Sequence, residues 1–155
     1  MGFSLKGFFQ KAFFLKGRKL NLLVFFFPLA LLANPHGAEV KSGALSFSSS
    51  ENTLSINQTS DRAIINWQEF SIKEGERAEF NLPSKAASTL NRVTGGNISE
   101  IYGQLKSSGQ LYLINPNGIV IGPSGRIDVA GFLASTYALS DSDYLSGEKL
   151  LFQEV

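Results

Sequence analysis

Residues 109–136 read GQLYLINPNGIVIGPSGRIDVAGFLAST, and this stretch decides the fold. It consists of short runs in which apolar and polar residues alternate, separated by equally short turns. Alternation with a period of two places every second side chain on one face of a β-strand. The turns contain glycine and asparagine, which tolerate positive φ, and proline, which presets the entry to a bend. The stretch therefore predicts short strands joined by tight corners.

The same alternation continues upstream, between segments rich in serine, threonine, asparagine and glycine, and sustained helical periodicity is absent from this part of the sequence. The chain after the N-terminal segment is therefore predicted to be all-β. Alternating apolar residues mark the expected strands, at Leu45 and Phe47, Leu54 and Ile56, Ala63, Ile65 and Trp67, Phe70 and Ile72, Ala78, Phe80 and Leu82, Leu111 and Leu113, Ile119 and Ile121, and Ile127 and Val129.

Two all-β architectures fit this rhythm: an antiparallel sandwich, and a solenoid in which each strand stacks on its equivalent one coil later. The single Asn-Gly pair, Asn117-Gly118, follows Asn115-Pro116, which makes a wider corner than a two-residue hairpin turn. The sequence therefore favours the solenoid. With coils of about 20 residues, the chain would form about five or six of them.

Length, charge and composition restrict the possible functions. The 155 residues, 43% of them hydrophobic, have the size of one ordinary domain. Residues 1–38 hold five of the 14 basic residues and no acidic ones, so the remainder is mildly acidic, which disfavours nucleic-acid binding. Cysteine is absent, and His36 is the single histidine. These counts exclude disulfides, cysteine-ligated metals and a catalytic triad, and we expect neither a cofactor nor a metal.

The N-terminal segment is typical of a secretory signal peptide. Residues 1–19 are basic and aromatic, and residues 20–33 form an apolar run that is too short for a transmembrane helix, which needs about 20 residues. We expect cleavage after Ala33, with Ala38 as the alternative, so that residues 1–33 are removed and residues 34–155 form the exported domain. A membrane-surface helix is a second interpretation of the basic and aromatic residues.

Several ordered motifs resemble one known family. They are LNRVTGGN (90–97), IYGQL (101–105), GQLYLINPNGI (109–119) and IDVAGFLAST (127–136), with IINWQEFSI (64–72) and NPHGA (34–38) upstream. This ordered set resembles the N-terminal secretion domain of the filamentous haemagglutinin family, also called the haemagglutination activity domain of two-partner secretion exoproteins. The resemblance covers essentially all of the chain after residue 33.

The resemblance implies a right-handed parallel β-helix. It also implies that a dedicated outer-membrane β-barrel transporter recognises the domain in the periplasm of a Gram-negative bacterium and threads it to the cell surface. Proteins exported in this way are typically adhesins, haemagglutinins, haemolysins or contact-dependent toxins. In such proteins the secretion domain is an address and a folding nucleus, and not an enzyme.

Two motifs are the candidate functional residues. Asn115, Pro116, Asn117, Gly118 and Ile119 match a signature that the resemblance links to secretion. Their asparagine side chains suit hydrogen bonds to nearby backbone, and Gly118 suits a left-handed hinge before Ile119 enters the core. The motif is therefore either a rigid corner or a direct contact for the transporter.

The second motif is Asn91-Arg92, which occupies the place of another asparagine motif in this family. We expect Asn91 to bond along an asparagine row of the solenoid and Arg92 to pair with Glu100 or Asp128, and a structural role is favoured for both. Trp67 alternates with Ile65, so a packing role is expected for it as well.

Alternative functions rest on dispersed polar and aromatic residues. Asp128, Arg126 and Tyr112 would be the nearest polar cluster of a polysaccharide-active β-helix enzyme, and Asp141 and Asp143 read as a solvated loop. A surface adhesin would use exposed tyrosines, namely Tyr102, Tyr112 and Tyr137.

The end of the sequence lacks the later coils and the long passenger of a full exoprotein, which suggests a truncated gene or a fragment. The last coil would then present unpaired strand edges. Residues from about Ser140 onward are therefore expected to fray or to pair with another chain.

Overall fold

The computed structural model describes residues 9–11, 24–26 and 34–155 and divides the chain into two units, Met1–Leu31 and Leu32–Val155. In the first unit, β1 (Phe9–Lys11) and β2 (Val24–Phe26) pair antiparallel. Most of the expected signal peptide, including its cleavage residue Ala33, lies outside the described residues.

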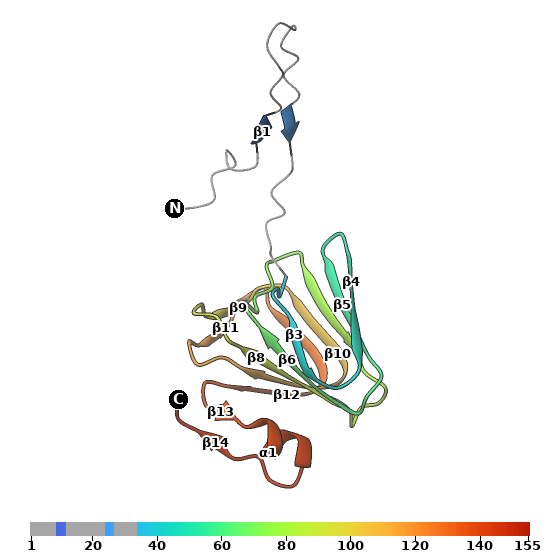
Figure 1. The fold of residues 1–155 in the computed structure, drawn as a ribbon, viewed down its shortest axis with the longest axis vertical. Helices are drawn as coiled ribbons and strands as arrows, with labels where there is room; N and C mark the ends of the chain where they lie inside the picture. The colour runs from blue at the N-terminus through green and yellow to red at the C-terminus, as the bar shows by residue number, and fades with distance from the viewer. Residues whose placement is uncertain (1–8, 12–23, 27–33) are drawn as a thin grey trace, which may run out of the picture. The chain divides into compact units, whose positions relative to one another are not determined.

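The second unit consists of strands and one short helix (Figure 1). In chain order these are β3 (Glu39–Ser42), β4 (Leu45–Ser50), β5 (Thr53–Gln58), β6 (Arg62–Trp67), β7 (Arg77–Asn81), β8 (Ser88–Val93), β9 (Ser99–Ile101), β10 (Gln104–Ile114), β11 (Ile119–Ile121), β12 (Arg126–Ser135), β13 (Ala138–Leu139), α1 (Asp141–Ser146) and β14 (Phe152–Gln153).

Parallel pairing arranges these strands into three rows, which are the sides of a solenoid. The first row contains β5, β7 and the first halves of β10 and β12, and the second contains β6, β8 and the second halves of β10 and β12. The third, shorter row contains β9 and β11, with Ile72 bridged to Ile101. A register irregularity between Ser107 and Gln110 marks the corner at which β10 passes from the first row to the second.

The fold is the predicted right-handed parallel β-helix, but it has about four turns and not five or six. The coils are longer than the expected length of about 20 residues, because Thr53 stacks on Arg77, Arg77 on Gln104, and Gln104 on Arg126. In addition, the two ends of the unit do not form coils. The predicted coil count was therefore too high.

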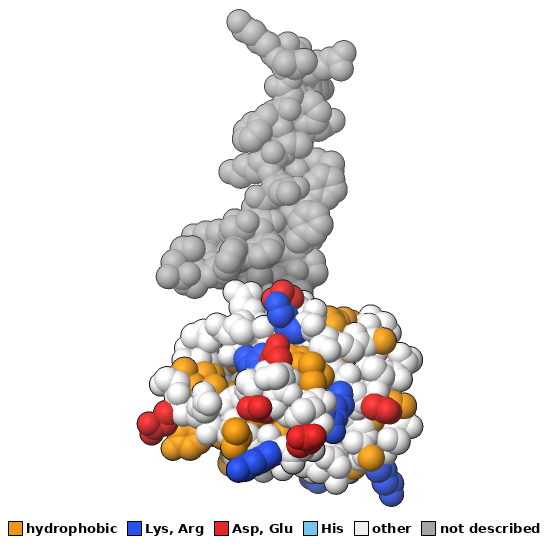
Figure 2. Space-filling model, turned by 60° about the horizontal axis from the view of Figure 1, so that its bottom comes forward, with side chains coloured by type: hydrophobic (Ala, Val, Ile, Leu, Met, Phe, Trp, Pro, Cys, Tyr) orange, Lys and Arg blue, Asp and Glu red, His pale blue; other side chains and the backbone are white. Residues whose placement is uncertain are grey.

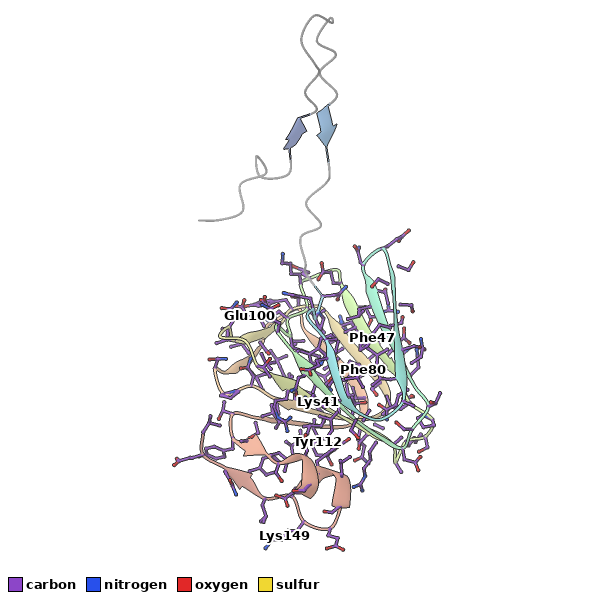
Figure 3. All side chains as sticks on the ribbon, in the orientation of Figure 1. Lys41, Phe47, Phe80, Glu100, Tyr112 and Lys149 are labelled. Carbon is purple, nitrogen blue, oxygen red and sulfur yellow. The ribbon has the colours of Figure 1, made fainter. Side chains whose placement is uncertain are left out.

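The interior is filled by the alternating apolar residues that the sequence marks. Ile56 and Phe80 pair in register in the first row and are fully buried, and Leu111 and Leu113 line the second row (Figure 3 labels Phe80). Trp67 is 1% exposed and makes edge-on contacts with Phe47 and Phe70, which confirms the predicted packing role. Stacking of like positions from successive coils thus forms one continuous core.

The N-terminal edge of the solenoid is covered by antiparallel strands. β3 pairs with β6 at the edge of the second row, and β4 pairs with β5 at the edge of the first. Just before β3, His36 forms an antiparallel bridge with Glu69. These pairings satisfy backbone groups that an open first coil would expose.

Residues 138–153, comprising β13, α1 and β14, leave the helical path and form a segment that we call the lateral segment (Figure 1). Ser140 caps the N-terminus of α1 by accepting a hydrogen bond from the backbone N–H of Asp143. Asp141 and Asp143 thus lie in the first turn of a helix, and their prediction as a solvated loop was wrong.

The lateral segment packs on the outer face of the second row. Its Leu139 and Tyr144 join outward-facing side chains of that row in a second apolar cluster, here called the lateral cluster, with the buried members Ile64, Leu90, Ile114, Leu139 and Tyr144. Tyr144 is only 2% exposed. This packing of Tyr144 disfavours the expected fraying of the residues from about Ser140 onward.

Candidate functional site

Asn115, the first residue of the secretion signature, is completely buried and fully hydrogen-bonded. Its side-chain amide donates to the backbone carbonyl of Asn97 at 3.0 Å and to the hydroxyl of Ser99 at 2.9 Å. Its side-chain oxygen accepts from the backbone N–H and the side-chain amide of Asn117, both at 3.0 Å. One asparagine therefore ties its own corner to the corresponding corner of the preceding coil.

The remainder of the signature completes this corner. Asn117 donates from its side chain to the carbonyl of Gly95 at 2.8 Å, and the carbonyl of Gly118 accepts from the backbone N–H of Ser99 at 2.9 Å. Gly118 has φ +123°, in the left-handed region that L-residues with a side chain avoid. Ile119 then begins β11 and packs against the core. These contacts fit the interpretation of the motif as a rigid corner.

Solvent reaches only part of the signature. Pro116 and Asn117 are exposed, Gly118 and Ile119 are half-buried, and Asn115 is inaccessible. A transporter that contacted the folded corner would therefore meet chiefly Pro116 and Asn117.

Asn91 lies inside the solenoid, and its side chain is not part of an asparagine row. Its register neighbours in the second row are Ile65 and Leu113. Its side-chain oxygen accepts a 2.9 Å hydrogen bond from the indole N–H of Trp67, and its amide donates to the carbonyl of Tyr112 at 3.3 Å. The predicted asparagine row was wrong, but the expected structural role fits these bonds, because they satisfy a polar group that is 1% exposed.

Arg92 points to the opposite side of the same strand and holds the lateral segment. Its guanidinium donates to a carboxylate oxygen of Asp141 and to the carbonyl of Leu139, both at 2.7 Å, and to the side chain of Asn66 at 3.2 Å. The predicted partners Glu100 and Asp128 were wrong. Glu100 belongs to the third row and Asp128 to the first-row part of β12, whereas Arg92 is in the second row.

Sequence reasoning missed a second arginine anchor and a buried tyrosine. Arg62 donates to the carbonyls of Tyr144 and Leu145 at the end of α1, both at 2.7 Å. The Tyr144 hydroxyl lies 2.6 Å from that of Ser88, and burial raises the pKa of Tyr144 to about 12, although the Ser88 hydrogen bond opposes this shift. The sequence feature that could have indicated this packing is the pair of apolar residues Ile64 and Leu90, which lie on the outward-facing side of β6 and β8.

The residues of the alternative functions do not converge. Asp128 is exposed on the first-row part of β12, whereas Tyr112 packs edge-on against Tyr144 with 5.5 Å between ring centroids. Tyr102 and Tyr137 are exposed, but Tyr112 is half-buried at the boundary with the lateral segment (Figure 3), so the predicted set of three exposed tyrosines was wrong.

The described residues contain no group of three or more histidine, cysteine, aspartate or glutamate side chains placed to hold a metal ion. Nor does any helix among them have the length and hydropathy to span a membrane. On the face drawn in Figure 2, acidic and basic side chains are interspersed without a continuous basic stripe.

The family comparison covers nearly all of the β-helical unit. The model of the TPS secretion domain matches residues 32–153. The chain belongs to this family of two-partner secretion domains. Membership implies a partner transporter of the two-partner pathway.

Solved and curated relatives support the same assignment. The crystal structure of the HMW1 secretion domain from Haemophilus influenzae has a TM-score of 0.74 and 35% sequence identity, and the match covers 79% of this chain and 32% of that one. A heme/hemopexin-binding protein of Haemophilus influenzae strain Rd is 39% identical over 102 residues, or 66% of this chain. A second Haemophilus influenzae protein of the same name is 45% identical over 83 residues, or 54% of this chain. The chain spans 11% and 9% of the lengths of these two relatives.

Proposed function

We propose that residues 34–155 are the secretion address of a two-partner exoprotein and that a dedicated outer-membrane β-barrel transporter recognises them in the periplasm. The observation that carries this proposal is the family match over residues 32–153, which coincides with one compact β-helical unit. Residues 1–33 would direct export into the periplasm, and the transporter would carry the domain to the cell surface of a Gram-negative bacterium. The domain itself is non-catalytic.

The domain also nucleates β-helix folding at the surface. Its N-terminal edge is covered by β3 and β4, whereas β12 pairs on one side only, with β10, among the described residues. A new coil can therefore add its strands to β12 but not to the opposite end of the solenoid. This asymmetry suits an exoprotein that leaves the transporter with its N-terminal domain already folded.

The exported protein would be of the adhesin or haemagglutinin type. The name of the two curated relatives adds heme or hemopexin binding as a candidate activity of its passenger. An adhesin role for the domain itself is supported only by exposed tyrosines, Tyr102 and Tyr137. An enzymatic role is disfavoured among the described residues, because Arg126 and Asp128 lie on the first row and Tyr112 lies on the second.

Secretion assays of the full chain test the main proposal. With the cognate transporter co-expressed, the processed chain is expected in the culture medium or on the cell surface. Without the transporter it is expected in the periplasm. Equal retention in the periplasm under both conditions would contradict the proposal.

The same secretion assay distinguishes the two interpretations of the signature at residues 115–119, a rigid structural corner and a direct contact with the transporter. We assign the signature to the corner, so Asn115→Ala should lower the melting temperature and secretion together, because it removes four hydrogen bonds of a buried side chain. Pro116→Ala, at an exposed position, should leave both unchanged, as should the matched control Pro123→Ala at another exposed corner. Loss of secretion in Pro116→Ala alone, with an unchanged melting temperature, would instead identify a transporter contact.

A further inference from the structure

Residues 34–38, which lie between the two candidate cleavage sites, are built into the fold. The backbone N–H of His36 donates to the carbonyl of Glu69 at 3.0 Å, and the carbonyl of His36 accepts from the backbone N–H of Gln68 at 3.1 Å. Pro35 is buried. Gly37 has φ +68°, and a Cβ atom there would lie 2.5 Å from the Cβ of Gln68, so this turn requires glycine. Cleavage after Ala38 would remove all of these contacts.

Asn34, the first residue of this segment, lines a small cavity of about 120 Å³ at the end of the third row. Its side-chain amide donates to the carbonyl of Asn52 at 3.2 Å. Its side-chain oxygen is buried and accepts no hydrogen bond, and it is the one such side-chain atom among the described residues. A buried oxygen without a donor costs about 1–3 kcal/mol, so Asn34 lacks a hydrogen-bond donor at the edge of this cavity.

The charges around the cavity point to a cationic donor. Glu69, Glu100 and Lys73 are among the residues that line this cavity. His36 lies with its Nε2 atom 3.7 Å from a carboxylate oxygen of Glu69. The lining residues thus include two acids and one permanently charged lysine, a balance that favours a further positive charge.

We propose that signal peptidase cuts this chain between Ala33 and Asn34 and that the new α-ammonium group of Asn34 binds in this cavity, between Glu69 and Glu100. In the precursor the Asn34 nitrogen is a neutral amide. After cleavage it is an amine whose ordinary pKa of about 8 keeps it largely charged at neutral pH. Processing thus supplies three N–H donors and the missing positive charge to the folded domain. This inference rests on the proposed export of the chain.

Processing of the full chain in a Gram-negative host tests the cleavage site. Mass spectrometry and N-terminal sequencing of the periplasmic protein should give Asn34 as the first residue, and a product beginning at Glu39 would overturn the proposal. In matched variants, Ala33→Leu should lower the yield of processed protein at least about tenfold, because the peptidase needs a small residue, whereas Ala38→Leu should be processed normally. Processed protein that accumulates in the periplasm with its transporter present would count against transporter recognition but not against this cleavage.

Selective acetylation of the α-amine tests its binding. Near neutral pH this reaction spares lysines, whose pKa is higher. Acetylation of the processed protein should lower its melting temperature by about 3 °C, the shift expected for the loss of one charged interaction in a domain of this size. The double variant Glu69→Gln/Glu100→Gln should lose this response, and Glu148→Gln, which changes an exposed carboxylate of the lateral segment, should keep it. Equal melting temperatures before and after acetylation would overturn the docking of the ammonium group.

Discussion

The interior core and the lateral cluster differ in how many elements support each buried side chain. Inside the solenoid, Phe80 has Ile56 and Ser107 as register neighbours in the adjacent coils. The lateral cluster instead depends on one short segment, which Tyr144 and two arginines hold against the outer face of the second row. The interior is thus built from repeated positions, and the lateral cluster from single anchors.

This difference predicts two kinds of response to mutation. A cavity in the interior weakens contacts within several coils, so it should lower the stability of the whole solenoid. Loss of a lateral anchor should release residues 138–153 while the coils stay folded, because local opening free energies follow local contacts. Four experiments test this contrast, and their expected effects decrease from the first to the last.

Phe80→Ala should have the largest effect. Phe80 is fully buried, and truncation of such a side chain costs about 4 kcal/mol through lost burial and the cavity left behind. Urea denaturation followed by circular dichroism should show one earlier transition of the whole domain. Phe47→Ala, at a phenylalanine that is 40% exposed, is the control and should cost about 1 kcal/mol. Equal losses in the two variants would contradict the account of the core.

Tyr144→Ala should loosen the lateral segment alone. The variant loses a side chain that is 2% exposed, its contact with Tyr112 and its hydrogen bond to Ser88, together worth about 3 kcal/mol of local stability. In native-state hydrogen exchange, amides of residues 138–153 should lose protection, whereas those of Leu113 and Val129 should keep theirs. Uniform loss of protection would show that the lateral segment and the coils unfold as one unit.

The raised pKa of Tyr144 makes the lateral cluster sensitive to alkali. A pKa of about 12 in the folded state, against 10.0 for the ordinary side chain, means that folding favours the neutral phenol. Its stabilising contribution is complete below pH 10 and is lost as pH rises from 10 to 12, up to about 2–3 kcal/mol.

Tyr144→Phe should remove this part of the pH dependence, measured as unfolding free energy at pH 9, 10, 11 and 12. Tyr137→Phe, at a tyrosine that is 48% exposed, should retain the wild-type profile. If the Tyr144→Phe profile matches that of wild type, burial of the Tyr144 phenol does not control the alkaline response.

Sequence alternation predicted the interior because an inward position is fixed by the pleat of its own strand. Leu111 and Leu113 are buried as expected, and the Asn115 corner forms through bonds to residues of the adjacent coil. The number of coils was not predictable in this way, because it depends on the length of the corners and on which end segments leave the helical path.

The lateral cluster was not predictable because its contacts join residues far apart in the sequence. Arg92 and Asp141 are 49 residues apart, and nothing in either local pattern indicates that α1 returns to the second row. The apolar residues Ile64 and Leu90 indicate that another segment covers the outer face of the second row. They do not indicate which segment it is.

Asp141→Asn should have the smallest effect of the four. The Arg92–Asp141 pair is close, at 2.7 Å, but the Asp141 side chain is 47% exposed, so solvent screens the attraction. Asparagine retains an oxygen that accepts from Arg92, and only the charge is lost, for a cost of about 0.5 kcal/mol. Urea denaturation at low and high salt should show this difference shrinking as salt rises, with Asp128→Asn, at an exposed position on β12, as the neutral control. A loss as large as that of Tyr144→Ala would mean that the ion pair anchors the lateral segment as strongly as the buried phenol does.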